Sequence, residues 1–577
     1  MVPARRVPLS TKFSLEKAMR TRASGGEYGI KAERDLLVPM RDGVHLAIDV
    51  YRPDAGGKFP VLLALSPYGK ATQRLMYPQP MPASTLGDAC IEAGDTNYIV
   101  PRGYVHVIAD TRGTGKSEGE YLSMYSEQES IDGYDLVEWL AKQPWCDGQV
   151  GMIGISYYGT IQLVVASSRP PHLKAIAPLE ATTDQYLACY HGGVIDAFYT
   201  ELLTGRHSSL SWHGYTKGNY RSWSQKHLPK EEYERRLRER MNDPAILQYN
   251  LLYSILEAPE KNPIFFDILM NPNSDSPYWW SPDLSKIDIP VLCGVGQFPN
   301  CGPKFVRGPG MIWEGVKGPK KMLISPPGWL DRPFVQHHDE IIRWYDYWFK
   351  GAQNGVMDEP PIRWFVTGDD EYHEEHEWPV ARTEWTDLYL RSFGRLSREP
   401  ETWGEIEPDG YTQEPLLVTN KIKSVSYSTG PMARDMEVSG PIALYLHVSI
   451  DAEDSYLKAT VYDADPNGKE RALTHGHLRL SHGKLDETQS KPWQPFHDHS
   501  EKATAAVKPG AVNEYAVELY PFMHVFRKGH QLRLEICSAD LPGAAFSYHV
   551  GSARTVSHKI YRDSTRRSRL HLPVLPR

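Results

Sequence analysis

The sequence predicts a chain of three parts: an α/β core, a helical insertion within that core, and a C-terminal all-β sandwich. Strand-like and helical segments alternate over residues 34–182, which is typical of a parallel sheet. The strand pattern lapses over residues 184–274 and then returns. Beyond residue 360, short alternating runs separated by Gly, Pro and Asp turns indicate a sandwich. We therefore place the core at 1–183 and 275–360, the insertion at 184–274 and the sandwich at 361–577.

Apolar runs mark the strands of the core. "LLVPMRDGVHLAIDVYRP" contains two strands joined by a hairpin turn at Asp42-Gly43, and "FPVLLALSP", "YVHVIAD", "VGMIGIS" and "KAIAPLEA" follow. The segment "SEQESIDGYDLVEWLAKQP" spaces its apolar residues as a helix does and ends at Pro144. After the insertion, "IDIPVLCGVG" and "KKMLISP" complete the sheet, and "HHDEIIRWYDYWFKG" is an amphipathic helix. We expect these helices to pack on the sheet.

Composition excludes several classes of partner. The 577 residues are 41% hydrophobic and 24% charged, which is enough to bury large cores. A net charge of -8 and the absence of a long basic run argue against nucleic acid. No window resembles a membrane span or a signal peptide, so we expect a cytoplasmic protein. The six cysteines form no CxxC pair, so we expect reduced thiols.

No motif predicts a metal or a cofactor. His373 and His376, like His497 and His499, lie in polar connecting sequence without further ligands at a recognised spacing. The acidic turns "DAEDSYL" and "DADPNG" do not match a calcium-binding loop. The Gly and Lys residues of "TRGTGKSEG" do not have the spacing of a phosphate-binding loop, so we interpret it as a structural turn.

Ser156 is the candidate nucleophile. It lies in "VGMIGISYYGT", where an apolar strand runs into Gly154-Ile155-Ser156-Tyr157-Tyr158-Gly159 and then into a helix-like segment. A sharp turn from strand to helix lifts a serine hydroxyl above an α/β sheet. The hydroxyl is a poor nucleophile unless a neighbouring base removes its proton. The functional prediction therefore depends on finding that base.

Several segments carry a family resemblance. They are, in order, "DGVHLAIDVYRP", "SPYGK", "ADTRGTGKSEGEY", "DGYDLVEWLAKQPWCDGQVGMIGISYYG", "YHGGV", "RWYDYWFKG" and "EVSGPIALYLHVS" with "RKGHQLRLEICSADLP". Together they resemble the CocE/NonD hydrolase family, which includes cocaine esterase, α-amino-acid ester hydrolases and X-prolyl dipeptidyl-peptidases. The resemblance spans residues 34–542. It implies an α/β-hydrolase core with an inserted helical cap and a C-terminal all-β jelly-roll domain.

The resemblance also implies part of a catalytic site. Ser156 stands where the family has its nucleophile, and the backbone N–H of Tyr157 would be one oxyanion donor. Tyr68, in "SPYGK", matches the tyrosine whose phenol is similar to the family's second donor. Such donors stabilise the negative charge that develops on the carbonyl oxygen during attack. An aromatic residue covering the core is the alternative interpretation of Tyr68.

The sequence departs from the family at the acid and the base. The family's acid lies in a phrase like Gly-Trp-x-Asp. In "CGVGQFPNCG", alignment on Gly296 puts Pro299 at the aspartate position, with Asn300 and Cys301 beside it. The family's base lies in a phrase like Gly-Pro-Trp-x-His. In "LISPPGWLDRPFVQHHDE" that region contains only Pro326, Pro327, Gly328 and Trp329. Neither the usual carboxylate nor the usual histidine is present.

His338 is the predicted replacement for the base, since a loop could bring it from just beyond the last core strand to Ser156. The alternative is a histidine at a helix start that packs on the core. Other candidates are its neighbour His337, His191 and His213 from the cap, and Asp331 from the loop. An aspartate would be a weak base for a serine hydroxyl unless burial raised its pKa.

The sequence thus predicts a serine-nucleophile acyl hydrolase acting on an ester, thioester or amide of a small molecule, through an acyl-enzyme. A first alternative keeps the pocket for a lyase, retro-aldol or cyclisation step, and a second is a binding protein without catalysis. The cap aromatics suggest an aromatic acyl group, although core packing would use the same residues. These aromatics include Tyr186, Tyr190, Phe198, Trp212, Tyr215 and Tyr220. The oligomeric state is left open.

Overall fold

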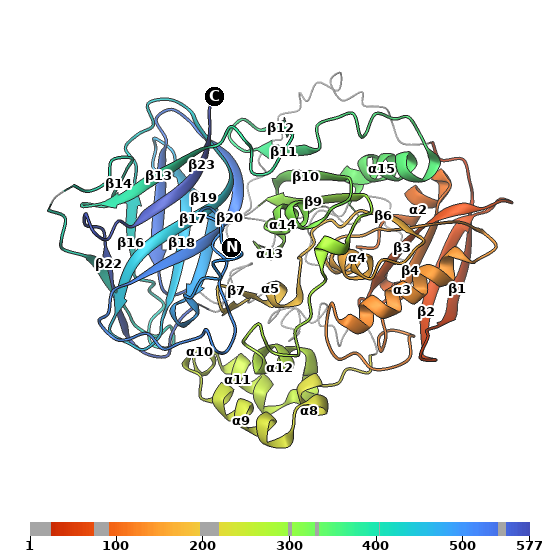
Figure 1. Ribbon diagram of the computed structural model, residues 1–577, viewed down its shortest axis with the longest axis horizontal. Helices are drawn as coiled ribbons and strands as arrows, with labels where there is room; N and C mark the ends of the chain where they lie inside the picture. The colour runs from red at the N-terminus through yellow and green to blue at the C-terminus, as the bar shows by residue number, and fades with distance from the viewer. Residues whose placement is uncertain are drawn as a thin grey trace, which may run out of the picture.

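The computed structural model describes residues 25–73, 92–196, 218–297, 303–328, 330, 334–402, 404–540 and 550–577. Figure 1 shows an α/β region at the right, a β-sandwich at the left and a group of helices at the lower edge between them. Two hydrophobic cores match this arrangement, because one fills the α/β and helical regions and the other fills the sandwich. No helix among these residues is long and apolar enough to cross a membrane.

A mixed sheet of ten strands forms the α/β region, in the order β1-β2-β4-β3-β5-β6-β9-β10-β11-β12. β3 pairs in parallel with β4 and β5, and β9 pairs in parallel with β10, which confirms the α/β prediction. The strands through β6 are β1 (Ile30–Pro39), β2 (His45–Pro53), β3 (Phe59–Ser66), β4 (Val105–Asp110), β5 (Cys146–Met152) and β6 (Leu173–Ile176). The others are β9 (Val291–Gln297), β10 (Lys320–Pro327), β11 (Ile362–Val366) and β12 (Glu371–Glu375).

Both ends of this sheet contain antiparallel pairs. β1 and β2 pair across the predicted turn, where Gly43 has a φ of 86° that favours glycine. At the other end, β11 pairs with β10 in parallel and with β12 in antiparallel fashion. The first sheet therefore extends past the boundary that we placed at residue 361, to Glu375.

Helices pack on the sheet, because its apolar strands need cover from water. α3 (Glu127–Ala141) begins with a capping box, in which Ser126 Oγ accepts from the Glu129 N–H and the Glu129 side chain accepts from the Ser126 N–H. α3 packs on α4 (Tyr157–Ser167), and a Cβ at Gly133 would lie 2.2 Å from Val165. The others are α1 (Lys70–Gln73), α2 (Thr96–Ile99), η1 (Val100–Arg102), η3 (Leu284–Lys286), α13 (Pro303–Val306), α14 (Gly308–Gly315), η4 (Val335–His337) and α15 (His338–Lys350).

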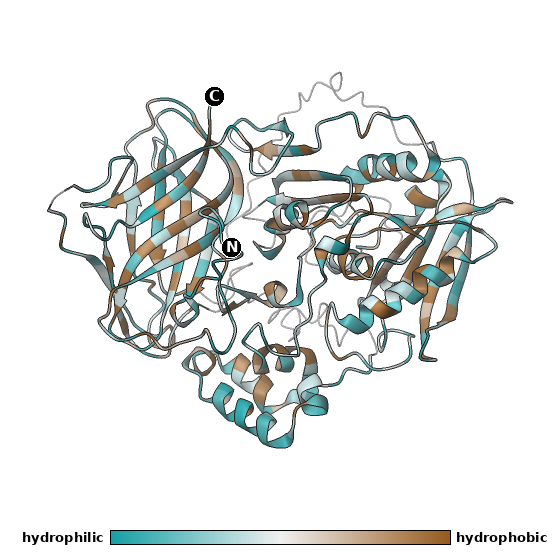
Figure 2. Cartoon of the chain, viewed as in Figure 1, coloured by the Kyte–Doolittle hydropathy of each residue, from teal (hydrophilic) through white to brown (hydrophobic). Residues whose placement is uncertain are grey.

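The described part of the insertion is mostly helical. Every residue of α12 (Pro263–Met270) is buried, whereas none of α9 (Lys230–Met241) is, and α9 is hydrophilic in Figure 2. Asp267 of α12 accepts hydrogen bonds from the N–H groups of Trp223 and Ser224 and so fixes the start of α8. The other elements are α5 (Gln185–Cys189), β7 (Tyr190–His191), β8 (Val194–Ile195), α8 (Trp223–His227), α10 (Pro244–Leu247), α11 (Asn250–Glu257) and η2 (Pro259–Lys261).

The C-terminal part is an all-β domain, as predicted from its alternating runs. Its strands belong to one eleven-stranded sheet that folds into two layers, with β17 paired to β20, β22 and β23. They are β13 (Glu384–Arg391), β14 (Arg395–Ser397), β15 (Asp409–Gln413), β16 (Ser424–Ser428), β17 (Met436–Ile450), β18 (Tyr456–Ala464), β19 (Glu470–Arg479), β20 (Asn513–Phe526), β21 (Gln531–Cys537), β22 (Val556–Tyr561) and β23 (Arg569–Leu575), with η5 (Leu480–His482) after β19.

Candidate active site

Ser156 occupies a strained turn between β5 and α4. Its φ of 61° and ψ of -118° are unusual for any residue other than glycine. Its N–H donates to the Leu179 carbonyl, and its own carbonyl accepts from the N–H groups of Gly159 and Thr160. Packing requires glycine at position 159, because a Cβ there would lie 2.1 Å from the Leu179 carbonyl oxygen. A strained turn from strand to helix is where a nucleophilic serine lies in an α/β-hydrolase fold.

Tyr68 lies beside this turn. It follows β3, its side chain is 7% exposed, and its N–H donates to Ser66 Oγ. The Tyr68 ring packs edge-on against the rings of Tyr157 and Tyr158, at centroid distances of 5.6 Å and 6.2 Å. The fold therefore brings Tyr68 to the two residues that follow Ser156.

Tyr157 is anchored by its phenol, which is fully buried. The hydroxyl donates to Glu129 Oε1 at 2.7 Å and lies 2.8 Å from the hydroxyl of Tyr121. It also accepts from the Tyr125 N–H at 3.2 Å. Burial raises the pKa of Glu129 to about 7, although the bond from Tyr157 lowers it. The sequence did not identify Glu129 as a site residue, because a glutamate three residues after Ser126 is typical of a helix cap.

The segments that follow β9 and β10 contain the departures from the family pattern. Residues 298–302 and 331–333 and Trp329 lie outside the described residues, so Pro299, Asn300, Cys301 and Asp331 are not placed. In the loop after β10, the Leu330 N–H donates to Glu180 Oε1 at 2.6 Å. Glu180 is fully buried and follows Leu179, the residue that accepts from the Ser156 N–H. A buried carboxylate therefore connects this loop to the backbone beside the nucleophile, which the sequence did not indicate.

His338 is the first residue of α15 and is 5% exposed. Its ring packs on Tyr98 at 4.4 Å and on Phe334 at 5.8 Å between centroids. A Cβ on Gly94 would lie 3.3 Å from the Phe334 ring and 3.6 Å from Ile153. Phe334 and Gly94 thus link the surroundings of His338 to Ile153, the residue that follows β5.

Two other histidines face different groups. His337 Nε2 is 3.1 Å from Ser325 Oγ on β10, and burial lowers its pKa to about 4. His191 Nδ1 is 2.7 Å from the hydroxyl of Tyr520, and its Nε2 is 3.4 Å from Glu518 of the sandwich. His213 lies outside the described residues.

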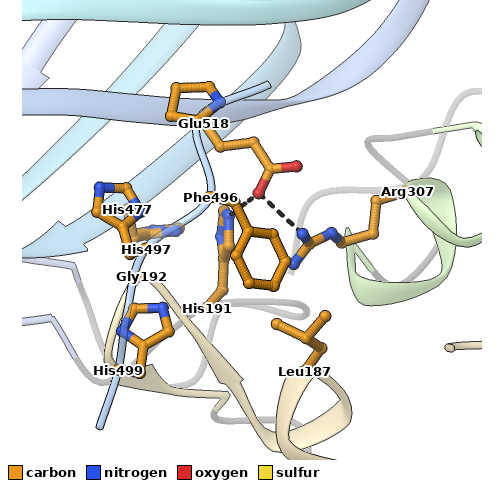
Figure 3. Close-up of a pocket in the computed structure, with 10 residues that line it drawn as sticks. Leu187, His191, Gly192, Arg307, His477, Phe496, His497, His499 and Glu518 are labelled. Atoms are coloured by element: carbon orange, nitrogen blue, oxygen red, sulfur yellow. Dashed lines mark ion pairs between the residues drawn. The ribbon is translucent and has the colours of Figure 1, made fainter. Parts of the chain in front are cut away.

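His191 belongs to a group of buried histidines where the cap, the core and the sandwich meet, which we call the histidine seam: His191, His475, His477, His482, His497 and His499. Figure 3 shows four of them around a small space of about 310 Å³, with Glu518 between His191 and Arg307. The Arg307 guanidinium is 3.0 Å from Glu518. Burial lowers the pKa of His482 to about 3 and of His497 to about 4. Neither here nor elsewhere in the described ranges do three or more His, Cys, Asp or Glu side chains have the arrangement of a metal site.

A larger cleft lies between the core and the cap and measures about 1260 Å³, part of it open to solvent. Trp223 of the cap lines one wall, together with Trp279 and Trp280 of the segment that follows the cap. Tyr121 and Glu129, which both contact the Tyr157 hydroxyl, line the core wall.

The cap aromatics named from the sequence that the structure describes do not line this cleft. Tyr186 and Tyr190 stack at 5.2 Å, and their hydroxyls donate to the carbonyls of Pro272 and Ile268. Tyr220 packs on Tyr121 at 5.5 Å. Phe198, Trp212 and Tyr215 lie outside the described residues. The placed members of that set are therefore packing residues, as the alternative interpretation held.

Comparison with known proteins places the chain among hydrolases of similar architecture. Residues 42–328 match the family model described as X-Pro dipeptidyl-peptidase (S15 family). Residues 354–571 match the model of the X-Pro dipeptidyl-peptidase C-terminal non-catalytic domain. Cocaine esterase from Rhodococcus sp. is 26% identical over 624 residues, which cover 96% of this chain and 100% of that protein.

Solved structures agree with this architecture. A CocE/NonD family hydrolase from Staphylococcus aureus superposes with a TM-score of 0.74 at 23% identity, covering 95% of this chain and 97% of its own. An α-amino acid ester hydrolase superposes with a TM-score of 0.68 at 17% identity, covering 98% of this chain and 100% of its own. At these identities the likeness supports the fold.

Proposed function

The chain belongs to the CocE/NonD family of serine hydrolases, and we propose that within this class it cleaves an ester, thioester or amide of a small molecule through an acyl-enzyme. In this proposal Ser156 Oγ attacks the carbonyl carbon while a base takes its proton. The Tyr68 phenol and the Tyr157 N–H donate to the oxyanion that forms. The leaving group then departs, and water hydrolyses the acyl-enzyme.

The observation that carries this proposal is the backbone of Ser156. A positive φ at a non-glycine residue costs about 1–3 kcal/mol and persists only where the surrounding structure enforces it. Here a hydrogen bond to Leu179 and the tight packing of Gly159 enforce it. A turn needed only for folding would be accommodated more favourably by glycine, so the retained serine supports a chemical role.

For the base we propose His338. Its burial beside Phe334 and its position in the chain after β10 support this choice. His191 is a weaker candidate, because both of its ring nitrogens face side chains of the sandwich. His337 is also weaker, because its Nε2 faces Ser325.

For the substrate we propose a molecule with an aromatic part, held in the cleft between the core and the cap. Three partly exposed tryptophans and Tyr121 give this cleft flat apolar walls. Offset or edge-on contacts with such rings favour aromatic groups over small aliphatic ones. Tyr121 and Glu129 line this cleft and both contact the Tyr157 hydroxyl, so they link the cleft to the residue that follows Ser156.

A fluorophosphonate tests the proposal without knowledge of the substrate. This reagent labels a serine efficiently only where a base removes the proton and donors receive the phosphonyl oxygen. We expect stoichiometric labelling at Ser156, located by peptide mass spectrometry, and no label at that peptide in Ser156→Ala. A folded protein that never labels would contradict the proposal. In that case, conversion of an aromatic acyl compound without an acyl-enzyme would favour the lyase alternative, and binding without conversion would favour the binding protein.

A further inference from the structure

The buried carboxylate of Glu129 has contacts that a helix cap alone does not require. Its Oε2 accepts from the Ser126 N–H at 2.9 Å, which completes the capping box of α3. Its Oε1 instead accepts from the Tyr157 hydroxyl at 2.7 Å, across the interface between α3 and α4. One carboxylate therefore joins the first turn of α3 to the first residue of α4.

The hydrogen bonds of the Tyr157 phenol are fully used. A phenol has one proton and two acceptor sites. The proton goes to Glu129, so the two acceptor sites are available for the Tyr125 N–H and the Tyr121 hydroxyl, and Tyr121 must be the donor in its pair. The rings of Tyr125 and Tyr68 pack on the Tyr157 ring at 4.4 Å and 5.6 Å. This network leaves the Tyr157 side chain little freedom to move.

The backbone of the same residue is a proposed oxyanion donor. Tyr157 is the first residue of α4, where an N–H has no acceptor within its own helix. Because oxyanion stabilisation depends on donors already aimed at the place where charge develops, an anchor on the Tyr157 side chain would also fix the direction of its N–H.

We propose that Glu129 is a positioning residue, which holds Tyr157 through its phenol so that the Tyr157 N–H stays aimed at the oxyanion of the acyl-transfer step. This inference rests on the proposed function. Glu129 acts through Tyr157 and does not touch the reacting atoms. It differs from a purely structural cap because its loss should weaken binding of the transition state more than binding of the ground state.

The protonation state of Glu129 should influence this anchor. The groups that face it are Tyr157 of α4, Tyr121 and Tyr125 of the preceding loop, and Ser126 and Asp132 of α3. An ionised carboxylate is a stronger acceptor than a carboxylic acid. Since the pKa of Glu129 is about 7, its hold on the Tyr157 hydroxyl should strengthen as pH rises through that value.

The test compares Glu129→Gln, Tyr157→Phe and the double variant with the wild type. The readouts are the second-order rate of fluorophosphonate labelling, the affinity for an arylboronic acid, which becomes a tetrahedral anion on serine, and the affinity for a neutral aryl amide as a ground-state mimic. We expect Glu129→Gln to slow labelling and to weaken boronate binding by about 10–100-fold, in line with partial loss of one oxyanion donor. Amide binding should stay within about twofold, and the double variant should be no worse than Tyr157→Phe alone.

Glu138→Gln is the matched control, because Glu138 also lies on α3 and accepts hydrogen bonds, but from His172 instead of Tyr157. The ratio of wild-type to Glu129→Gln boronate affinity should rise between pH 6 and pH 8. If the wild type labels at Ser156 but Glu129→Gln behaves like Glu138→Gln, Glu129 is not a positioning residue. If Glu129→Gln does not fold, an unchanged labelling rate in Tyr157→Phe overturns the inference. A folded wild type that does not label overturns the proposed function itself.

Discussion

The two sides of the candidate active site differ in how far they keep the family pattern. On the side of β3 and β5 lie Ser156, Tyr68 and Tyr157, which the resemblance assigns to the family positions. They are held by backbone hydrogen bonds, ring packing and the buried Glu129. On the side of β9 and β10, proline, glycine and tryptophan replace the usual acid and base phrases. A buried Glu180 instead accepts from the Leu330 N–H.

This contrast shows which part of such a site tolerates change. The proposed nucleophile and the proposed Tyr157 N–H donor depend on backbone geometry, since a strained turn and an N–H at a helix start cannot move without rebuilding β5 and α4. An acid and a base contribute only a side chain each, so another residue that reaches the same place can replace them. We call the side of β3 and β5 the conserved side and the side of β9 and β10 the altered side. Substitutions can show whether the conserved side carries the chemistry and whether the altered side still supplies a base.

The largest effect should follow from removing the nucleophile. Ser156→Ala should lower kcat by roughly 10⁶-fold, since loss of a catalytic serine leaves only binding and the oxyanion donors. The measurement is turnover of an aryl ester that the wild type cleaves, together with circular dichroism to show that the variant is folded. Residual turnover near the wild-type rate would mean that the conserved side does not carry the chemistry.

The second effect tests the altered side. His338→Ala should lower kcat by about 10²–10⁴-fold, the usual contribution of a positioned acid or base. His337→Asn is the control, since His337 faces Ser325. Equal activity of the two variants would return His338 to the role of a packing residue at a helix start.

A third effect sharpens the conserved side. Tyr68→Phe removes the phenolic hydroxyl and keeps the ring that packs on Tyr157 and Tyr158. We expect kcat to fall by about 10²–10³-fold with the melting temperature nearly unchanged. The measurement is steady-state kinetics together with a thermal melt of the same preparation. Unchanged turnover would make Tyr68 an aromatic cover of the core.

Acid limits the pH range over which the two sides can be compared. Burial lowers the pKa of the seam histidines, His497 to about 4 and His482 to about 3, so the unfolded chain binds protons more tightly than the folded one. Their contribution is present above pH 6.5 and is lost as pH falls toward those values. At pH 5.5, each histidine that stays neutral in the folded protein should lower the free energy of unfolding by up to about 1.4 kcal/mol. The raised pKa of Glu129 acts in the opposite direction over the same range. The loss is therefore measured by urea titrations of the wild type and of His497→Asn at pH 7.5 and 5.5. An equal pH dependence of the two unfolding free energies would contradict it.

The smallest effect should come from the cleft. Trp280→Ala should raise KM for an aryl-acyl ester by about 2–10-fold and leave an acetyl ester unaffected, in line with the worth of one aromatic contact. Trp385→Ala is the control, because Trp385 stacks on Trp493 within the sandwich. An equal change for both esters would exclude the cleft as the site for the aromatic part of the substrate.

Local sequence was sufficient to predict the strands, helices and turns whose formation depends on neighbouring residues in the chain. Apolar strands alternating with amphipathic helices are enough to predict the α/β core, and Asp42-Gly43 between two strand-like runs predicts the turn at Gly43. The predicted elbow at Ser156 also follows from local sequence, because a strand, a small-residue turn and a helix adjoin one another in the chain. The short alternating runs beyond residue 360 likewise predict strands.

Only the tertiary structure decided which distant residues meet. Glu129 and Tyr157 are 28 residues apart, and their bond exists because α3 packs on α4. Glu180 and Leu330 are 150 residues apart, and the histidine seam draws on the cap, the sandwich strand β19 with η5 after it, and a sandwich loop. The spacing of apolar residues within a segment does not show which distant residue that segment contacts. Burial determines only which positions along a strand or helix are apolar. The partner of a buried polar group is set by how whole elements pack.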